Sequence, residues 1–373
     1  MTDDMKTRKH LYLILASVSG LALALGCGKG EGTVPDWPWT DPETPETPVT
    51  PEKPTESEYP VIPETPHAAF VDPTTAGWEN ITADYPGLRS DISVYRFSDK
   101  FFTRPAVAYI AVADASKAGF GVWSINDPEL KGCDEAFRTP SKVYEACSAS
   151  VIVNGGFFYS SGGKNYSASV AVSEGTRLGV NINYASEDWK TMYYPTRAAF
   201  IEHADGSFES CWTYYASSGA HYTYQTPAPN SWKKKPGKVP SATYPETAVE
   251  FEAKNAIGGG PVLLKNSKVI DSYVEELFDG ASGIGPDVYA PRTAIGVSAD
   301  SKLVFFVCEG REMTDGVTGL TTEEVAKVLY SLGCRDAINL DGGGSSCMLI
   351  GGKETIKVSD GHQRAVASAV MFK

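Results

Sequence analysis

The sequence predicts an α+β domain with a largely antiparallel, mixed β-sheet core and a few flanking helices. Short segments rich in β-branched and aromatic residues, each bounded by Gly, Pro, Asp or Ser, recur from about residue 106 onward. One strong helix pattern lies between two of these segments, and the order strand, helix, strand permits one locally parallel pair. Before residue 67 the composition is very different and predicts no packed structure.

Residues 1–27 have the pattern of an export signal that ends at a lipidation site. Basic side chains near the start precede an uncharged apolar run over residues 11–25, which is shorter than the roughly 20 residues of a membrane-spanning helix. Leu-Gly-Cys27 then resembles a lipobox, with Ala24 where leucine is usual. We expect Cys27 to be acylated and the protein to be exported and lipid-anchored to the bacterial cell envelope, with the outer membrane favoured. Simple secretion is the alternative.

Residues 28–66 predict a disordered spacer rich in Pro, Thr and Glu. The segment holds ten prolines, and residues 35–66 hold eight acidic side chains against one lysine. Because proline fixes φ and like charges repel, we expect an extended stalk between membrane and domain. A Pro-rich docking site is the alternative.

Residues 67–373 should form one catalytic domain, because no second low-complexity break interrupts them. Much of the net charge of −13 belongs to the spacer, so the domain is mildly acidic. It lacks the basic patch that binds nucleic acid, and we expect a monomer with no nucleic-acid partner.

The strand pattern is clearest in four short segments, at 106–112, 150–153, 293–297 and 303–307. The last two are separated by Ser298-Ala-Asp-Ser301, which predicts a hairpin turn. The helix begins with the capping box Thr321-Thr-Glu-Glu324, continues with one apolar face and ends at Gly333. A short strand over 336–340 follows the helix.

Residues 210–245 show neither helical nor strand periodicity over any length, so we expect an irregular insertion rich in Tyr, Trp, Pro and Lys. It could be a substrate-facing flap or a surface loop that packs its aromatic side chains onto the domain.

Six cysteines remain once Cys27 carries lipid, and the expected compartment permits disulfides. Fifteen pairings are open, so none is assigned. Cys308 lies in an apolar run and also fits a buried free thiol.

Three polar residues stand at the end of an apolar strand and directly before glycine: Asn154, Glu309 and Asp341. Such a turn brings backbone N–H groups to the surface, where a ligand can approach. One of these residues alone is an ordinary turn residue, whereas three together predict a site.

The run that begins at Asp341 is the most specific of these features. Its backbone N–H groups and hydroxyls could cradle a phosphate oxygen, and Asn339 points to the same face of the strand as Asp341. A Walker P-loop is excluded because no Gly-Lys-Ser/Thr follows. The residues of the expected cradle are Gly342, Gly343, Gly344, Ser345 and Ser346.

Arg292, Arg311 and Arg364 are candidates for holding phosphate, because a guanidinium pairs with it through two N–H groups. The chain has five histidines, which argues against a multi-histidine metal centre, and no Gly-x-Ser-x-Gly elbow of a serine hydrolase. We expect no cofactor, although a divalent cation at Asp341 and Glu309 is left open.

In chain order, these motifs closely resemble the phosphodiester glycosidase family over about residues 90–373. Glu309 stands where the family often has Asp. The segments that carry the resemblance are Asn154-Gly-Gly-Phe-Phe158, Gly258-Gly-Gly-Pro-Val-Leu-Leu264, Arg292-Thr-Ala-Ile-Gly296, Glu309-Gly-Arg311, Gly319–Ala326 and Asn339-Leu-Asp-Gly-Gly-Gly-Ser-Ser346.

This resemblance implies hydrolysis of a sugar-1-phosphodiester at the glycosidic bond, on a cell-surface or environmental glycan. Asp341 or Glu309 would be the base or nucleophile, and the arginines would hold the phosphate. Asn154 and Asn339 would orient the sugar, with Gly155 and Thr293 as further substrate-binding residues. The alternatives are a phosphodiesterase that breaks the P–O bond and a non-catalytic glycan-binding lipoprotein.

Overall fold

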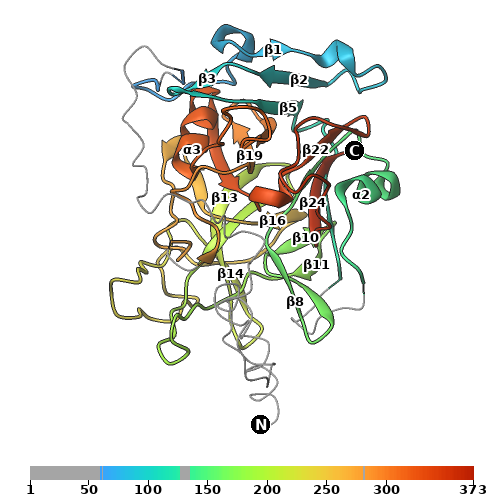
Figure 1. Cartoon of the computed structure of the whole chain (residues 1–373). Coiled ribbons are helices and arrows are strands. Elements are labelled where there is room, and N and C mark those ends of the chain that lie inside the picture. Colours follow the sequence, from blue (N-terminus) through green and yellow to red (C-terminus); the bar gives the residue numbers. More distant parts are fainter. Residues whose placement is uncertain (1–58, 61, 127–134, 280–281) are drawn as a thin grey trace, which may run out of the picture.

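The computed structural model describes residues 59–373, apart from 61, 127–134 and 280–281. The expected export signal, Cys27, Cys133 and nearly all of the spacer lie outside these residues. Three antiparallel sheets make up most of the described part (Figure 1). The expected α+β class is therefore corrected to a mostly β fold, with two α-helices in the described part: α2 (Pro140–Cys147) and α3 (Thr322–Ser331).

The largest sheet has eight strands and contains the hairpin predicted around Ser298. Ser301 N donates to Ser298 O at 3.1 Å in its turn. In spatial order the strands are β1 (Glu79–Asn80), β2 (Ile92–Phe97), β5 (Ala108–Asp114), β20 (Lys302–Cys308), β19 (Arg292–Ser298), β21 (Cys334–Asn339), β17 (Val262–Lys265) and β18 (Lys268–Val269).

A locally parallel pair does not form around α3. Strand β19 lies between β20 and β21 and pairs antiparallel with both, so these two strands share a direction without touching. The helix carries the chain across one strand and β21 then takes the free edge of β19, because the hairpin has already used the other edge. Strand β21 also pairs antiparallel with β17.

Helix α3 has the predicted capping box. Thr321 Oγ1 accepts from Glu324 N at 3.2 Å, and the Glu324 carboxylate accepts from Thr321 N at 3.0 Å. The apolar face of the helix, with Val325, Val328 and Leu329, packs on the eight-stranded sheet (Figure 1). Gly333 has φ +86, which suits the position at which the chain leaves the helix.

The second sheet has seven strands and contains residues that the sequence analysis assigned to an irregular insertion. That expectation is wrong for residues 208–224, which form a hairpin whose Trp212, Tyr214 and Tyr224 are buried. Aromatic and Thr residues favour strands, and burial on both faces hides the period of two. In order the strands are β11 (Thr176–Gly179), β10 (Ala171–Ser173), β16 (Asn255–Gly258), β12 (Arg197–Glu202), β13 (Phe208–Tyr215), β14 (His221–Tyr224) and β15 (Val249–Glu250).

The third sheet brings the middle and the end of the chain together. Its central strands, β7 and β24, pair antiparallel. In order its strands are β23 (Lys353–Glu354), β22 (Met348–Ile350), β7 (Val151–Asn154), β24 (Ser368–Phe372) and β6 (Phe120–Ser124). Two small hairpins complete the strands: β3 (Lys100–Phe101) with β4 (Arg104–Pro105), and β8 (Phe158–Ser161) with β9 (Lys164–Ser167). Short 3-10 helices are η2 (Pro73–Ala76), η3 (Thr82–Asp84) and η6 (Gly343–Ser345).

One apolar core joins the three sheets. Phe305 of β20, Phe200 of β12 and Phe372 of β24 are fully buried in it, and the rings of Phe305 and Phe372 stack with centroids 3.9 Å apart. The neighbouring Phe306 faces the opposite way and packs under α3. Because β20 is buried on both faces, its sequence is an unbroken apolar run.

The first described residue, Tyr59, lies inside the range expected to be spacer and packs against the domain. Its ring lies 5.4 Å from that of Phe97 and 5.5 Å from that of Phe101, and its hydroxyl accepts from Trp78 Nε1 at 3.0 Å. No helix in the described residues is long and apolar enough to cross a bilayer.

The expectation of disulfides is not met among the described cysteines, all of which are free thiols: Cys147, Cys211, Cys308, Cys334 and Cys347. Burial raises the pKa of each of these thiols. Cys308 is buried in the core, which confirms the free-thiol alternative given for it.

Candidate active site

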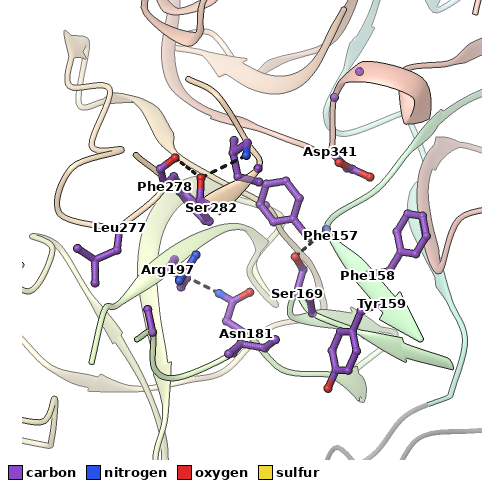
Figure 2. Close-up of a pocket in the computed structure, with 18 of the residues that line it drawn as sticks. Phe157, Phe158, Tyr159, Ser169, Asn181, Arg197, Leu277, Phe278, Ser282 and Asp341 are labelled. Carbon is purple, nitrogen blue, oxygen red and sulfur yellow. Dashed lines mark hydrogen bonds between the residues drawn. The ribbon is translucent and has the colours of Figure 1, made fainter. Parts of the chain in front are cut away.

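A cavity of about 520 Å³ contains Asp341 and the Gly-rich turn after β21 in its wall. Its other walls come from the start of β8, the loop 181–189 after β11, the first residue of β12 and residues 277–278 and 282–284. Figure 2 shows the aromatic rings of Phe157 and Phe158 near Asp341, with Tyr159 farther along the same wall. The cavity therefore brings together residues of the seven-stranded sheet, the eight-stranded sheet and the β8–β9 hairpin.

Asp341 lies two residues after the end of β21 and is half-buried in the cavity wall. Burial raises the pKa of its carboxyl group to about 6. Hydrogen bonds from the Ser345 hydroxyl and Gly342 N and the positive charge of Arg364 act in the opposite direction, while Asp360 adds to the increase. Asp341 can thus gain or lose a proton near neutral pH, as acid–base catalysis requires.

Arg364 and Arg311 supply the positive charge on this side of the cavity. Arg364 forms an ion pair with Asp360 at 2.7 Å, and its Nη1 lies 3.4 Å from Ser345 Oγ. Arg311 is more exposed and lies 3.9 Å from the Asp360 carboxylate. Both guanidinium groups line the cavity, as expected for residues that would hold phosphate.

Arg292 also lines the cavity, but its guanidinium is already used by the protein. It is 1% exposed and donates to the backbone oxygens of Leu320, Ile284, Gly285 and Val288 at 2.5–3.2 Å. Four of its five N–H donors therefore hold the loop before β19, which leaves little capacity for phosphate. Its main role is structural.

The Gly-rich turn is more closed than the expected phosphate cradle. Gly343 N donates to Pro291 O at 2.8 Å, Ser345 N to Gly342 O and Ser346 N to Gly343 O, both at 3.1 Å. Gly342, Gly343 and Gly344 line the cavity, whereas Ser345 and Ser346 are buried behind it. Three N–H groups of the turn are therefore already hydrogen-bonded within the protein and are not free to bind phosphate. The contribution of the turn to the site is that its glycines let a ligand come close to the backbone.

Asn154 positions the turn from behind the cavity wall. It is fully buried, donates to Asp341 O at 2.6 Å and accepts from Thr293 Oγ1 at 2.8 Å and Cys347 N at 3.1 Å. Gly155 O accepts from Asp341 N at 3.0 Å. Thr293 and Asn154 thus tie β19 and β7 to the turn, and neither lines the cavity.

Asn339 is likewise buried away from the cavity. Its side chain donates to Gly260 O at 2.8 Å and Leu340 O at 2.6 Å, which joins β21 to the second Gly run. Asn154, Gly155, Thr293 and Asn339 were expected to bind substrate, and the structure places all four as supports for the wall.

Glu309 does not line the cavity. It is 4% exposed, and its carboxylate accepts from Thr314 Oγ1 at 2.6 Å and Lys357 N at 2.9 Å. The strand end at Glu309 therefore does not share a site with the strand ends at Asn154 and Asp341. This placement argues against the catalytic role expected for it.

Several lining residues were missed by the sequence analysis. Arg197, the first residue of β12, is a lone cation followed by four apolar residues, and that exception was the available signal. Trp189 lies at the cavity wall 40% exposed, and Ser186 and Asp188 hold its loop. Of the Trp and Tyr residues in 210–245, Trp232 lines the cavity. No three His, Cys, Asp or Glu side chains of the described residues are arranged to hold a metal ion.

The sequence model of the phosphodiester glycosidase family matches residues 148–373, which include every cavity residue named above. A curated relative, the SPbeta prophage-derived uncharacterized protein YomE of Bacillus subtilis strain 168, is 34% identical over 118 residues. That match covers 32% of this chain and 17% of the relative, so the chain matches about a sixth of that protein's length.

Two solved structures share the fold. The catalytic domain of zebrafish N-acetylglucosamine-1-phosphodiester alpha-N-acetylglucosaminidase, auto-inhibited by its pro-peptide, aligns with TM-score 0.50 and 20% identity over 86% of this chain and 96% of that one. A hypothetical protein from Synechocystis aligns with TM-score 0.50 and 15% identity over 79% of this chain and 63% of that one. At these identities the likeness concerns the fold alone.

Proposed function

This chain belongs to the phosphodiester glycosidase family, and on that premise we propose that it hydrolyses a sugar-1-phosphodiester at the glycosidic bond. The products would be a free sugar and a phosphomonoester. The proposed substrate is part of a cell-surface or environmental glycan, which matches a protein exported and held at the envelope through Cys27.

The observation that carries this proposal is the charge of the cavity. Its lining has four arginines, Arg197, Arg292, Arg311 and Arg364, against two carboxylates, Asp341 and Glu187, in a chain with net charge −13. A positive cavity in an acidic protein selects an anionic ligand. The aromatic side chains of the wall supply apolar faces on which a sugar ring can lie.

The chemistry needs one ionised carboxylate and a means of stabilising the departing phosphate. Asp341 in its ionised form would stabilise the oxocarbenium-like transition state or activate the attacking water. Arg311 and Arg364 would neutralise the phosphate as the glycosidic bond breaks. A phosphate leaving group held by cations needs no strong acid, so one carboxylate at this wall is sufficient.

The test is turnover of glycosyl-1-phosphodiesters by the full chain and two variants. Asp341→Asn should lower kcat by about 100- to 10,000-fold, because it removes the carboxylate that acts on the reacting carbon. Glu309→Gln is the matched control, since Gln can keep both structural hydrogen bonds of this buried side chain, and its kcat should stay within about threefold of wild type.

Hydrolysis in oxygen-18 water identifies the broken bond. Label should enter the released sugar, whereas a phosphodiesterase would place it in phosphate. Equal turnover by Asp341→Asn and wild type, or label in phosphate, would contradict the proposal. Binding without turnover across the panel would instead indicate a glycan-binding protein.

A further inference from the structure

Arg197 is a buried cation in the cavity wall that the proposed mechanism does not use. Arg197 is 9% exposed. Within the described residues its guanidinium donates no hydrogen bond and forms no ion pair within 4 Å. No atom of the described part of the chain forms a hydrogen bond with its buried Nε. Burial lowers the pKa of Arg197 to about 10, so the group remains charged at neutral pH.

Comparison with Arg292 shows how unusual it is for a buried guanidinium in this cavity wall to lack hydrogen-bond acceptors. The two arginines line the same cavity and are similarly buried, but Arg292 has four backbone oxygens around its guanidinium. A buried charged donor without an acceptor is costly, and native proteins rarely keep one without a function. Arg197 is therefore built to meet an acceptor that the protein itself does not provide.

The surroundings hold Arg197 in place and leave its polar edge for the cavity. The guanidinium carbon lies 4.3 Å from the centre of the Phe278 ring, and Phe278 also lines the cavity. Asn181 Nδ2 donates to Arg197 O at 3.2 Å and fixes the backbone at the start of β12. Figure 2 shows Arg197 and Asp341 on opposite sides of Phe157.

The remaining influence on Arg197 is the buried carboxyl group of Glu276. Glu276 favours the charged form of Arg197 through space, but the two side chains form no ion pair in the described part of the chain. Its oxygens accept from Val262 N at 2.8 Å, Ala198 N at 2.8 Å and Trp212 Nε1 at 3.1 Å, and they contact Ser272 Oγ at 2.7 Å. Glu276 thus accepts four hydrogen bonds from other groups and, in the described part of the chain, none from Arg197.

We propose that Arg197 binds a carboxylate carried by the sugar of the substrate, so that the enzyme acts on 1-phosphodiesters of acidic sugars. A planar guanidinium pairs with a planar carboxylate through two N–H groups, and one positive charge balances one negative charge. The phosphodiester lies at Arg311 and Arg364, and the sugar spans the aromatic wall between the two cationic positions. This inference rests on the proposed function.

The test compares two substrates that differ in one group. Glucuronic acid-1-phosphodiester and glucose-1-phosphodiester with the same alcohol are given to the full chain, and the ratio of their kcat/KM values is measured. Wild type should prefer the acidic sugar by about 10- to 100-fold. Arg197→Met should bring the ratio close to one, and Arg197→Lys should retain part of the preference because it keeps the charge.

Arg177→Met is the matched control. Arg177 also lies over an aromatic ring in the same sheet, 4.7 Å from the centre of Tyr215, but it does not line the cavity. Its ratio should equal that of wild type. Circular dichroism and the melting temperature of each variant show whether it is folded, and a wild-type ratio near one would overturn the inference without needing any variant.

Two further outcomes distinguish this inference from the proposed function. If Arg197 holds the phosphodiester itself, Arg197→Met lowers kcat/KM for both substrates by the same factor, which overturns the inference and leaves the function. If neither substrate is hydrolysed, calorimetric titration with glucuronic acid 1-phosphate and glucose 1-phosphate decides. Tighter binding of the acidic probe that is lost in Arg197→Met supports the inference alone, and equal binding overturns it.

Discussion

At the scale of single residues, the carboxyl group of Asp341 is poised between opposing influences. Burial favours its neutral form, while the Ser345 hydroxyl, Arg364 and Gly342 N favour its ionised form, and the resulting pKa is about 6. An ordinary aspartate titrates about two units lower. A change in any one of these neighbours should therefore move the pH at which the enzyme becomes active.

We expect kcat/KM to rise with pH through about 6, because Asp341 acts in its ionised form. Ser345→Ala removes a hydrogen bond that stabilises the carboxylate, so the rising limb should move upward by about one pH unit. Ser346→Ala is the control, since the buried Ser346 hydroxyl has no partner. Profiles of kcat/KM from pH 4.5 to 8.5 measure both, and a wild-type limb that falls over this range would contradict the assignment.

The same ionisation should be visible in stability. The pKa of Asp341 is higher in the folded than in the unfolded chain, so its contribution to stability is fully present below about pH 4 and is lost as pH rises through about 6. Asp341→Asn cannot ionise. The melting temperature of Asp341→Asn minus that of wild type should therefore increase between pH 4 and pH 8. A difference that stays constant over this range would show that the pKa of Asp341 is not raised.

At the scale of elements, the turn between β21 and η6 depends on the absence of side chains. A Cβ on Gly344 would overlap Arg364 Nη2 and the Asp360 carboxylate oxygens. A Cβ on Gly259 would overlap Asn339 O, which belongs to the strand before the turn. Glycine is required at Gly259 because backbone lies against it, whereas a Cβ at Gly344 would have to displace the side-chain ends of the Arg364–Asp360 pair.

Gly344→Ala should push the Arg364–Asp360 pair out of place and lower kcat/KM by about 10- to 100-fold. The control is Gly237→Ala, because neither glycine has a positive φ and the nearest atom to a Cβ at Gly237 is Tyr244 Oη at 3.6 Å. Steady-state kinetics of the two folded variants measure the difference. Unchanged activity in Gly344→Ala would show that this ion pair does not contribute to the reaction.

At the scale of the whole molecule, a Pro-rich and acidic segment of the sequence separates Cys27 from Tyr59, which packs on the domain. We propose that acyl chains on Cys27 hold the enzyme at the envelope while this segment gives the domain reach. Such a tether suits a substrate that is part of a larger glycan, because the domain stays near the surface.

Cys27→Ser should release the protein from the membrane fraction, because two acyl chains are what hold it there stably. Cell fractionation followed by detection of the full chain measures the change, and Cys147→Ser, at a half-buried free thiol, is the control. A Cys27→Ser protein that stays in the membrane fraction would refute the lipid anchor.

Local patterns predicted part of the fold well. The β19–β20 hairpin and α3 were predicted because a turn, a capping box and an apolar helix face each depend on residues that are close together in the sequence. The β13–β14 hairpin was not predicted, since its aromatic side chains are buried on both faces and leave no alternation to detect. The order of strands around α3 was not predicted either, because it depends on which edge of β19 is still free to pair.

By itself, the sequence determined the family, the Gly-rich turn at Asp341 and the candidate arginines, because these are local motifs in a fixed order. Only the tertiary structure decided which of those residues face the cavity. Asn154, Asn339 and Glu309 look like site residues in the sequence, yet their hydrogen bonds are spent within the protein. Arg197 gave a weaker signal and lies in the cavity without an acceptor. The reason is that satisfaction of a polar side chain depends on contacts between distant segments, which local spacing does not encode.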